Sequence, residues 1–436
     1  MSRSSYDREI FRLALPALGA LAAEPLYLLA DTAIVGHIGT PQLAALALAA
    51  TVLSAVVTLC NFLTYGTTAQ VARLHGAREE ERAGQIAAQA LWLSLGIGVA
   101  LAIAVVVLAH PLMLVIGGHG HAARLAERYL RLSAPGVVFA LVALAGQGYL
   151  RGIGQLRRPL VILVAANAAN VVLELVLVYV LDMGLDGSAL GTVAAQAGMG
   201  VAFTAALLRA GGPGVSRAPR AADLRALARM GGDLLVRTGS LLAAFVVSSA
   251  IVARAGAAAL AAHQIASQLF LFLALVLDSI AIAGQVLVGR MLGAGDADGA
   301  FAAARRMIGW SLVVGAAFGV ILLAVTTLLP QAFTSDPRVL HQAHLLWPLF
   351  ALMQPIGAVV FALDGILIGA GDTRYIALAM AFSALVCFMP VAVASGVLDW
   401  GVVGVWSALN VLMVARMVTM GRRFTGRRWA TVGAAA

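Results

Sequence analysis

The chain has 436 residues, of which 61% are hydrophobic and 11% are charged, with a formal net charge of +9. Soluble domains carry about 25% charged residues, so this composition excludes a soluble globular protein. A transmembrane barrel is also excluded, because its short alternating segments do not occur in the sequence. We therefore expect an all-α polytopic membrane protein with about twelve transmembrane helices, each of about 20 apolar residues.

Twelve apolar runs follow one another along the chain, and the longest polar interruption divides them six and six. They cover roughly residues 10–36, 43–69, 85–109, 123–148, 159–181, 188–209, 230–253, 258–288, 307–330, 341–368, 375–397 and 403–421. The predicted organisation is an N-terminal lobe (1–209), an inter-lobe linker (210–229), a C-terminal lobe (230–421) and a basic tail (422–436).

Loops rich in arginine alternate with loops that contain little of it. Cytoplasmic loops of membrane proteins carry an excess of basic residues, so the bias places both termini in the cytoplasm and explains the positive charge without nucleic acid. The N-terminal stretch MSRSSYDREIFRL lacks a cleavage pattern and is expected to be retained.

Three motifs recur with one offset of 217 positions. The pairs are IVGHIGTPQLAA (34–45) with IVARAGAAALAA (251–262), ARLHGA (72–77) with GRMLGA (289–294), and RGIGQLRRP (151–159) with IGAGDTRYI (368–376). Repeats of six spans keep their orientation, so the two lobes should be related by a pseudo-two-fold axis along the membrane normal. Such an arrangement is typical of transporters.

Five acidic residues lie well inside the predicted spans: Glu24, Asp31, Glu174, Asp278 and Asp364. A carboxylate at a helix centre costs roughly 2.5–3.5 kcal/mol on insertion scales, and such residues usually face a bundle interior or water. Burial favours the neutral carboxyl group, which can then exchange a proton near neutral pH. This is the chemistry of a proton relay.

Glu24, Tyr27 and Asp31 follow i, i+3, i+7 spacing and share one helix face. Pro25 lies in the same helix and can bend it, which frees a backbone carbonyl. Asp31 is the main candidate for proton coupling.

Asn167, Asn170 and Glu174 form a second polar stripe with the same spacing. The alternative for each of these residues is a structural hydrogen bond between helices, which membrane bundles also use.

In the second half, Asp278 and Asp364 are secondary candidates, and Arg237 also lies in a span and could neutralise one of them. His263 is more typical of a packed histidine than of a proton carrier.

The offset of 217 aligns Asp31 with Ser248 and Glu174 with Val391. The two halves thus differ in ionisable chemistry, and proton exchange is expected in the N-terminal one. The sequence holds no metal-ligand spacing, and the two cysteines lie in apolar runs, so we expect no cofactor and no metal.

Several segments together resemble the multidrug and toxic compound extrusion (MATE) family: LALPALGALAAEPLYLLADTAIVGHIGTPQLAALALA, ARLHGA, RGIGQLRRP, AAHQIA and LIGAGDTR. The stretch VLDSIAIAGQVLVGRMLGAGD resembles the branch named for DNA-damage-inducible protein F. The resemblance covers about residues 10–420.

This resemblance implies a monomeric twelve-helix antiporter of the bacterial inner membrane that exports amphipathic, often cationic compounds in exchange for protons or sodium. The position of the branch's proton site corresponds to Asp31, with Tyr27 one turn before it. The family partners in the N-terminal lobe correspond to Gln147, Asn170, Glu174 and Thr192, with Glu at 174 where Asp is commoner.

Sodium-coupled relatives carry an acid in the seventh helix, where this chain has Arg237. Protons are therefore the favoured coupling ion, although Asp364 resembles a C-lobe carboxylate of those relatives.

Other readings stay open. A flippase for lipid-linked precursors should have a more basic cavity, whereas Arg237 is the one arginine expected to be clearly buried. A membrane-embedded transferase would need paired acids, and only Asp182 and Asp186 show such spacing. A channel would need repeated acidic rings.

Overall fold

The computed structural model describes residues 3–434, which are all-helical without strands. Twelve helical segments of this part of the chain are long and apolar enough to cross a membrane, which confirms the predicted fold class. The helices of the first half are α1 (Arg3–Gly36), α2 (Thr40–Cys60), α3 (Phe62–Gly76), α4 (Glu80–Val115), α5 (Gly120–Gly152), α6 (Arg157–Leu175), η1 (Val176–Val180) and α7 (Gly184–Leu208).

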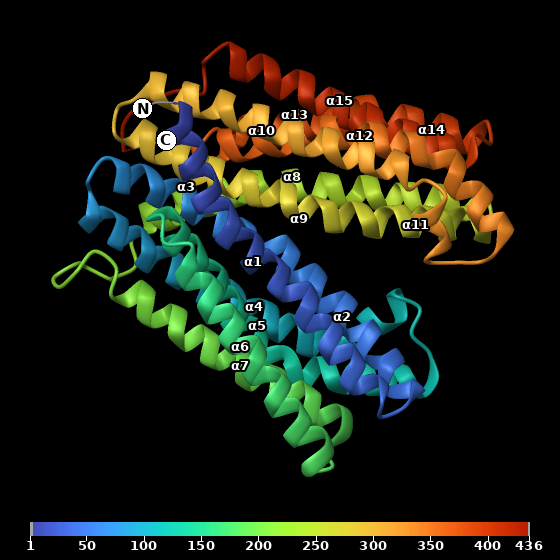
Figure 1. Cartoon of the computed structure of the whole chain (residues 1–436). Coiled ribbons are helices and arrows are strands. Elements are labelled where there is room, and N and C mark those ends of the chain that lie inside the picture. The colour runs from blue at the N-terminus through green and yellow to red at the C-terminus, as the bar shows by residue number, and fades with distance from the viewer. Residues whose placement is uncertain (1–2, 435–436) are drawn as a thin grey trace. The chain divides into compact units, whose positions relative to one another are not determined.

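The second half has the same sequence of long helices (Figure 1). Its elements are α8 (Ala221–Arg254), α9 (Ala257–Gly293), α10 (Ala297–Ala324), α11 (Leu328–Gln331), α12 (Pro337–Gly369), α13 (Thr373–Phe382), η2 (Ser383–Phe388), α14 (Met389–Val397) and α15 (Gly401–Thr425). The segments η1 and η2 are π-helical: η1 forms the end of the fifth span and η2 interrupts the eleventh.

The chain forms two compact units, one of residues 19–231 and one that joins the residues up to Leu18 with those from Gly232 onward. These boundaries differ from the sequence-based division in two places, the start of α1 and the expected linker. The start of α1 packs with the second unit because Asp7 pairs with Arg306 (2.6 Å) and Glu9 pairs with Arg290.

The expected linker packs with the first unit instead. Its backbone accepts hydrogen bonds from α4, where Gln89 donates to the carbonyl of Ala218 (2.9 Å) and Trp92 to that of Arg217 (2.8 Å). Arg82 forms an ion pair with Asp223 at 2.6 Å. Part of the expected linker, from Ala221, is already helical because it is the first part of α8.

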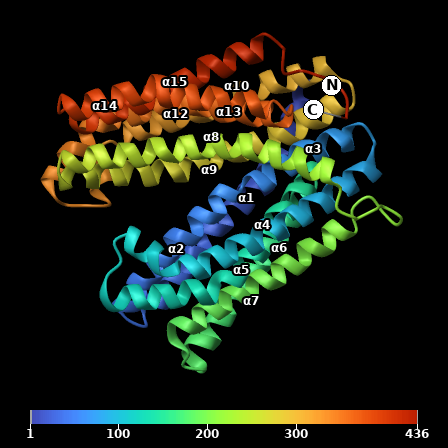
Figure 2. The same ribbon diagram turned by 180° about the vertical axis from the view of Figure 1, so that it is seen from behind.

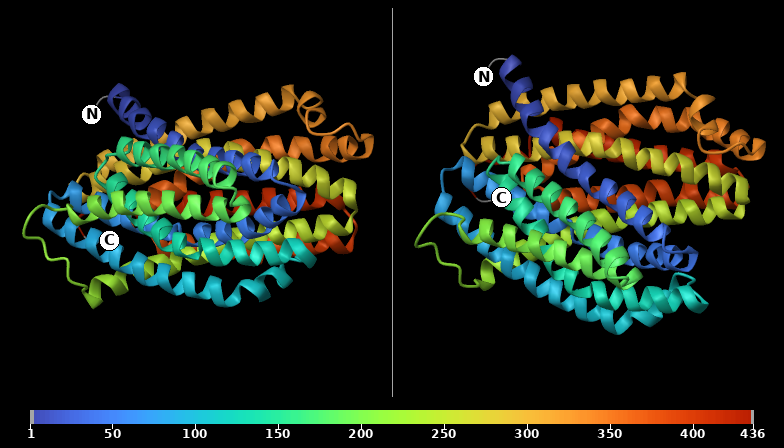
Figure 3. Two further views of the ribbon diagram at one scale, coloured as in Figure 1. Left: turned by 90° about the horizontal axis from the view of Figure 1, so that it is seen from below. Right: turned by 60° about the horizontal axis from the view of Figure 1, so that its bottom comes forward.

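Each unit is built around one central helix. In the first unit α5 packs against α2, α3, α4 and α7, and in the second unit α12 packs against α9, α10 and α15. Within each unit the helices run side by side along their length, as the view from behind and the two tilted views show (Figures 2 and 3).

Glycines allow the central helices to approach their neighbours closely. A Cβ atom on Gly148 of α5 would lie 2.7 Å from the carbonyl oxygen of Thr64, and one on Gly365 of α12 would lie 2.1 Å from that of Ala281. Small residues at such contacts let membrane helices pack backbone to backbone. Both the glycines and their neighbours are related by the offset of 217, so the sequence repeat is also a packing repeat.

The central helices also end alike. Gly154 (φ 76°) follows α5 and Gly371 (φ 79°) follows α12, again at the repeat offset. Each donates its N–H to a carbonyl three residues back, that of Arg151 (2.8 Å) and that of Ile368 (2.9 Å). The left-handed conformation favours glycine, which explains the glycine in both motifs.

The start of α1 and the last described residues, after α15, lie at the same end of the second unit (Figure 1). This fits an even number of spans.

Candidate functional site

The first unit holds a cluster of buried polar side chains on α1, α6 and α7. Asp31 is 3% exposed, and its Oδ1 accepts a hydrogen bond from the Ser188 hydroxyl at 2.9 Å. The apolar residues around it on α1 anchor the helix in the unit, with Val35 fully buried in the core. Asp31 therefore points into the bundle and not toward lipid.

Glu174 is fully buried at the last turn of α6, directly before the π-helical segment η1. The Thr192 hydroxyl donates to its Oε1 (3.2 Å), while Tyr27 contacts the same hydroxyl (3.1 Å) and Asn170 donates to it (3.3 Å). A hydroxyl has one proton to donate. Because Thr192 uses this proton in its hydrogen bond to Glu174, the Tyr27 hydroxyl must be the donor to the Thr192 oxygen.

The Asp31 and Glu174 carboxyl groups are close enough to interact electrostatically. The Oε2 atom of Glu174 is buried and has no donor among the described residues. Two adjacent carboxylates cannot both be ionised at low cost, so a proton between them would satisfy both groups.

Two members of this cluster were missed by the sequence interpretation. Ser188 lies one turn before Thr192 on α7, and this i, i+4 spacing was the available signal. Tyr129 is 3% exposed and lies beside the hydroxyls of Ser188 and Thr192. Gly191 makes room, since a Cβ there would lie 3.1 Å from the Cγ atom of Glu174.

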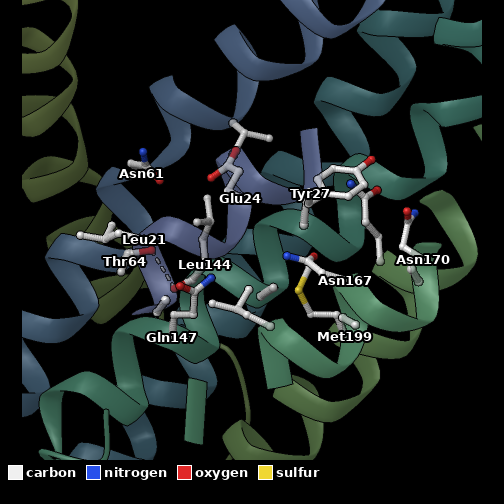
Figure 4. Close-up of a pocket in the computed structure, with 18 of the residues that line it drawn as sticks. Leu21, Glu24, Tyr27, Asn61, Thr64, Leu144, Gln147, Asn167, Asn170 and Met199 are labelled. Atoms are coloured by element: carbon white, nitrogen blue, oxygen red, sulfur yellow. Dashed lines mark hydrogen bonds between the residues drawn. The ribbon is translucent and has the colours of Figure 1, made fainter. Parts of the chain in front are cut away.

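A pocket lies beside the cluster, entirely within the first unit (Figure 4). Its volume is about 1070 Å³, including the part open to solvent. The polar side chains that line it are Glu24, Tyr27, Asn61, Thr64, Tyr65, Gln147, Arg151, Asn167, Asn170, Thr192 and Gln196. Tyr27, Asn170 and Thr192 thus belong both to the pocket wall and to the hydrogen-bond chain that ends at Glu174.

The structure places Gln147 in this pocket, where its Oε1 accepts a hydrogen bond from Arg151 at 3.1 Å. Asn167 donates to the backbone carbonyl of Ala23 at 2.9 Å and so fixes α6 to α1. The polar stripe expected on α6 is therefore divided: Asn167 holds the backbone, while Asn170 and Glu174 form part of the buried cluster.

The buried acid of the second unit, Asp364, has charged hydrogen-bond partners. Asp364 is 3% exposed, and its Oδ2 accepts from Arg237 (2.7 Å) and from Arg416. The expectation that Arg237 could neutralise an acid holds for Asp364. Asp278, in contrast, is half-buried on α9.

The expectation that Arg237 is the one clearly buried arginine is wrong. Arg73, Arg151 and Arg416 are 0%, 6% and 2% exposed, respectively. Arg73 and Arg151 lie near the ends of their spans, close to charged loops in sequence, while neighbouring helices cover them in the fold.

His263 is 1% exposed, its Nε2 atom is 3.1 Å from the Ser249 hydroxyl, and its ring packs edge-on against Trp406 at 5.9 Å. This is the geometry of a packed histidine. Among the described residues no group of three or more His, Cys, Asp and Glu side chains could hold a metal ion.

The model of the MatE family matches residues 16–176 and 240–394 of this chain. "Protein DETOXIFICATION 44, chloroplastic" of Arabidopsis thaliana is 34% identical over 94% of this chain and 80% of its own length. "DNA damage-inducible protein F" of Escherichia coli is 29% identical over 96% and 92% of the two chains. "Multidrug resistance protein PmpM" of Pseudomonas aeruginosa is 25% identical over 96% and 92%.

Among solved structures, the Vibrio cholerae MATE transporter VcmN matches with a TM-score of 0.88 at 18% identity, covering 98% of this chain and 99% of its own. This similarity supports the fold.

Proposed function

We propose that this chain, which belongs to the MatE family of membrane transporters, is a secondary active efflux antiporter that exports amphipathic, often cationic compounds in exchange for protons by alternating access. That the protein is a transporter follows from its family and its fold. The proton coupling and the kind of compound are argued from the site.

One observation supports the proposal most directly: side chains that line the pocket also belong to the hydrogen-bond chain that ends at Glu174. Tyr27, Asn170 and Thr192 line the pocket and also form the hydrogen-bond chain to Glu174. When Glu174 is ionised, the Thr192 hydroxyl donates to it. When Glu174 carries a proton, it becomes a donor, and Thr192 can turn its own proton toward the pocket wall. Protonation thus changes the hydrogen-bonding surface that a bound compound meets.

The energy of one proton is sufficient for export. A pH difference of one unit is worth about 1.36 kcal/mol, and 100 mV adds about 2.3 kcal/mol per charge moved. Together they can maintain roughly a hundredfold to thousandfold gradient of a compound if the coupled charge movement is favourable.

Protons suit this site better than sodium. Sodium coupling at Asp364 would require a carboxylate that is open to a cation, but Asp364 already binds the guanidinium groups of Arg237 and Arg416. Asp31 and Glu174 instead accept hydrogen bonds from the neutral hydroxyl groups of Ser188 and Thr192, which tolerate both the charged and the neutral carboxyl.

The test is drug-dependent proton flux in proteoliposomes, followed with a pH-sensitive dye, with and without sodium. Replacing Asp31→Asn should reduce this flux to that of protein-free vesicles. Asp182→Asn is the matched control, since Asp182 is exposed and adopts φ 52°, a conformation that asparagine accepts well. Unchanged flux in the Asp31→Asn variant, or flux that requires sodium, would refute proton coupling at this site.

We also propose a monomer in the bacterial plasma membrane with both termini in the cytoplasm. The orientation is argued from the loops rich in arginine, which lie on the side of both termini in the sequence. A fluorescent reporter fused to the C-terminus, probed with an external quencher, tests the orientation.

A further inference from the structure

We propose that Glu24 is the residue that recognises the positive charge of the exported compound, so that the pocket selects hydrophobic organic cations. Charge recognition would then be separate from proton exchange at Asp31 and Glu174. The inference rests on the proposed efflux function and assigns a residue to its specificity.

Glu24 lies near the middle of α1 and lines the pocket (Figure 4). Its side chain is exposed, and it makes no hydrogen bond or ion pair with any described residue. A carboxylate inside a span normally pairs with another group or faces a water-filled cavity. Glu24 is therefore not explained by pairing, because no described side chain bonds to its carboxyl group. The remaining explanation is that it faces a water-filled cavity.

The surroundings of Glu24 suit a cation. The other titratable groups that line the pocket are Tyr27, Tyr65 and Arg151. Tyrosine rings attract organic cations through their π faces. Arg151 is 6% exposed and donates to Gln147, so the accessible charge on the pocket wall is that of Glu24.

The backbone near Glu24 adds a further acceptor. Pro25 has no N–H group, so the carbonyl of Leu21 lacks its usual helical donor, and Leu21 also lines the pocket. A cationic group beside Glu24 would thus be close to the partial negative charge of this carbonyl oxygen as well as to the carboxylate.

The rest of the wall fits an apolar body. Val57, Leu144, Leu163 and Met199 line the pocket, and the polar side chains between them mostly carry uncharged amide or hydroxyl groups. Pockets for drug-sized ligands have volumes of about 300–1000 Å³ and mainly apolar walls with a few polar groups. The walls of this pocket have this character.

Asp31 cannot take the same role in this conformation. It is 3% exposed and bound to Ser188, and it is not one of the residues that line the pocket. The two acids of α1 thus differ in access although they share a helix face: Glu24 faces the pocket and Asp31 faces the interior.

The experiment compares two probes of similar shape, tetraphenylphosphonium, a permanent cation, and triphenylphosphine oxide, which is neutral. Binding to the purified full-length protein in lipid nanodiscs is measured by calorimetry at a fixed pH and without a gradient. Glu24→Gln should raise the Kd of the cation about tenfold or more, while the Kd of the neutral probe changes less than about twofold. Glu24→Asp should keep part of the preference, because it keeps the charge.

Glu79→Gln is the matched control, since Glu79 is exposed before α4 and caps no helix end with its side chain. It removes the same charge from outside the pocket and should change neither Kd. An unchanged cation Kd in Glu24→Gln, or an equal loss for both probes, would overturn the inference. Because binding is measured at equilibrium, this failure is distinct from a missing proton flux in the wild type, which would reject the antiporter instead.

Discussion

The two units each bury an aspartate in a membrane-spanning helix, yet they surround it with different partners. Asp31 is held by a serine hydroxyl and interacts electrostatically with a second carboxyl group, that of Glu174. Asp364 is held by two arginines. A neutral partner leaves the protonation state of a carboxyl group free to change, whereas guanidinium groups fix it as an anion. The comparison teaches that partner chemistry, and not burial alone, separates a proton-exchanging acid from a structural one.

The largest expected effect comes from making the same substitution in both places. Asp364→Asn leaves Arg416 buried without its carboxylate, and breaking a buried ion pair in this way costs about 3–5 kcal/mol. Asp31→Asn removes no charge partner and should cost less than about 1.5 kcal/mol. Thermal unfolding of both variants in detergent measures the difference.

Equal destabilisation by the two substitutions would contradict the proposed difference between Asp31 and Asp364, since it would mean that Asp31 is also fixed as an anion. A double variant that combines Asp364→Asn with Arg416→Met should be less destabilised than the sum of the single changes, because the two groups interact directly.

An intermediate effect is expected where the pocket meets the acidic pair. Thr192→Val keeps the shape of the side chain but removes the hydroxyl that joins Tyr27, Asn170 and Glu174. Leaving buried polar groups unsatisfied costs about 1–3 kcal/mol, and drug-dependent proton flux should fall about tenfold.

Thr204→Val is the control for this change, because Thr204 lies on the same helix, α7, and makes no side-chain hydrogen bond with a described residue. If both valine variants lose the same flux, Thr192 has no coupling role beyond the packing of α7.

The smallest effect is expected for an ion pair outside the buried region. Arg128 pairs with Asp186, but the Arg128 side chain is 68% exposed. Exposed ion pairs contribute about 0–1 kcal/mol, so Arg128→Ala should hardly shift the unfolding temperature. A loss as large as that of Asp364→Asn would show that exposure is a poor guide to ion-pair strength in this protein.

Prediction from sequence was most successful where a property depends on the order of residues alone. The twelve spans follow from runs of apolar residues, and the repeat follows from one offset that also relates Gly148 to Gly365 in the packing. Glu24, Tyr27 and Asp31 were placed on one helix face by their spacing, but this spacing did not distinguish the pocket-facing acid from the buried one.

Hydropathy and repeat spacing depend only on the order of the residues. The sequence by itself therefore determined the membrane class, the number of spans and the candidate acids. Tertiary structure alone decided which of those acids are paired. Ser188 lies 157 positions from Asp31, and Arg416 lies 52 positions from Asp364. A carboxyl group's behaviour in the membrane depends on its neighbours in space, and the fold brings these together from helices that are far apart in sequence.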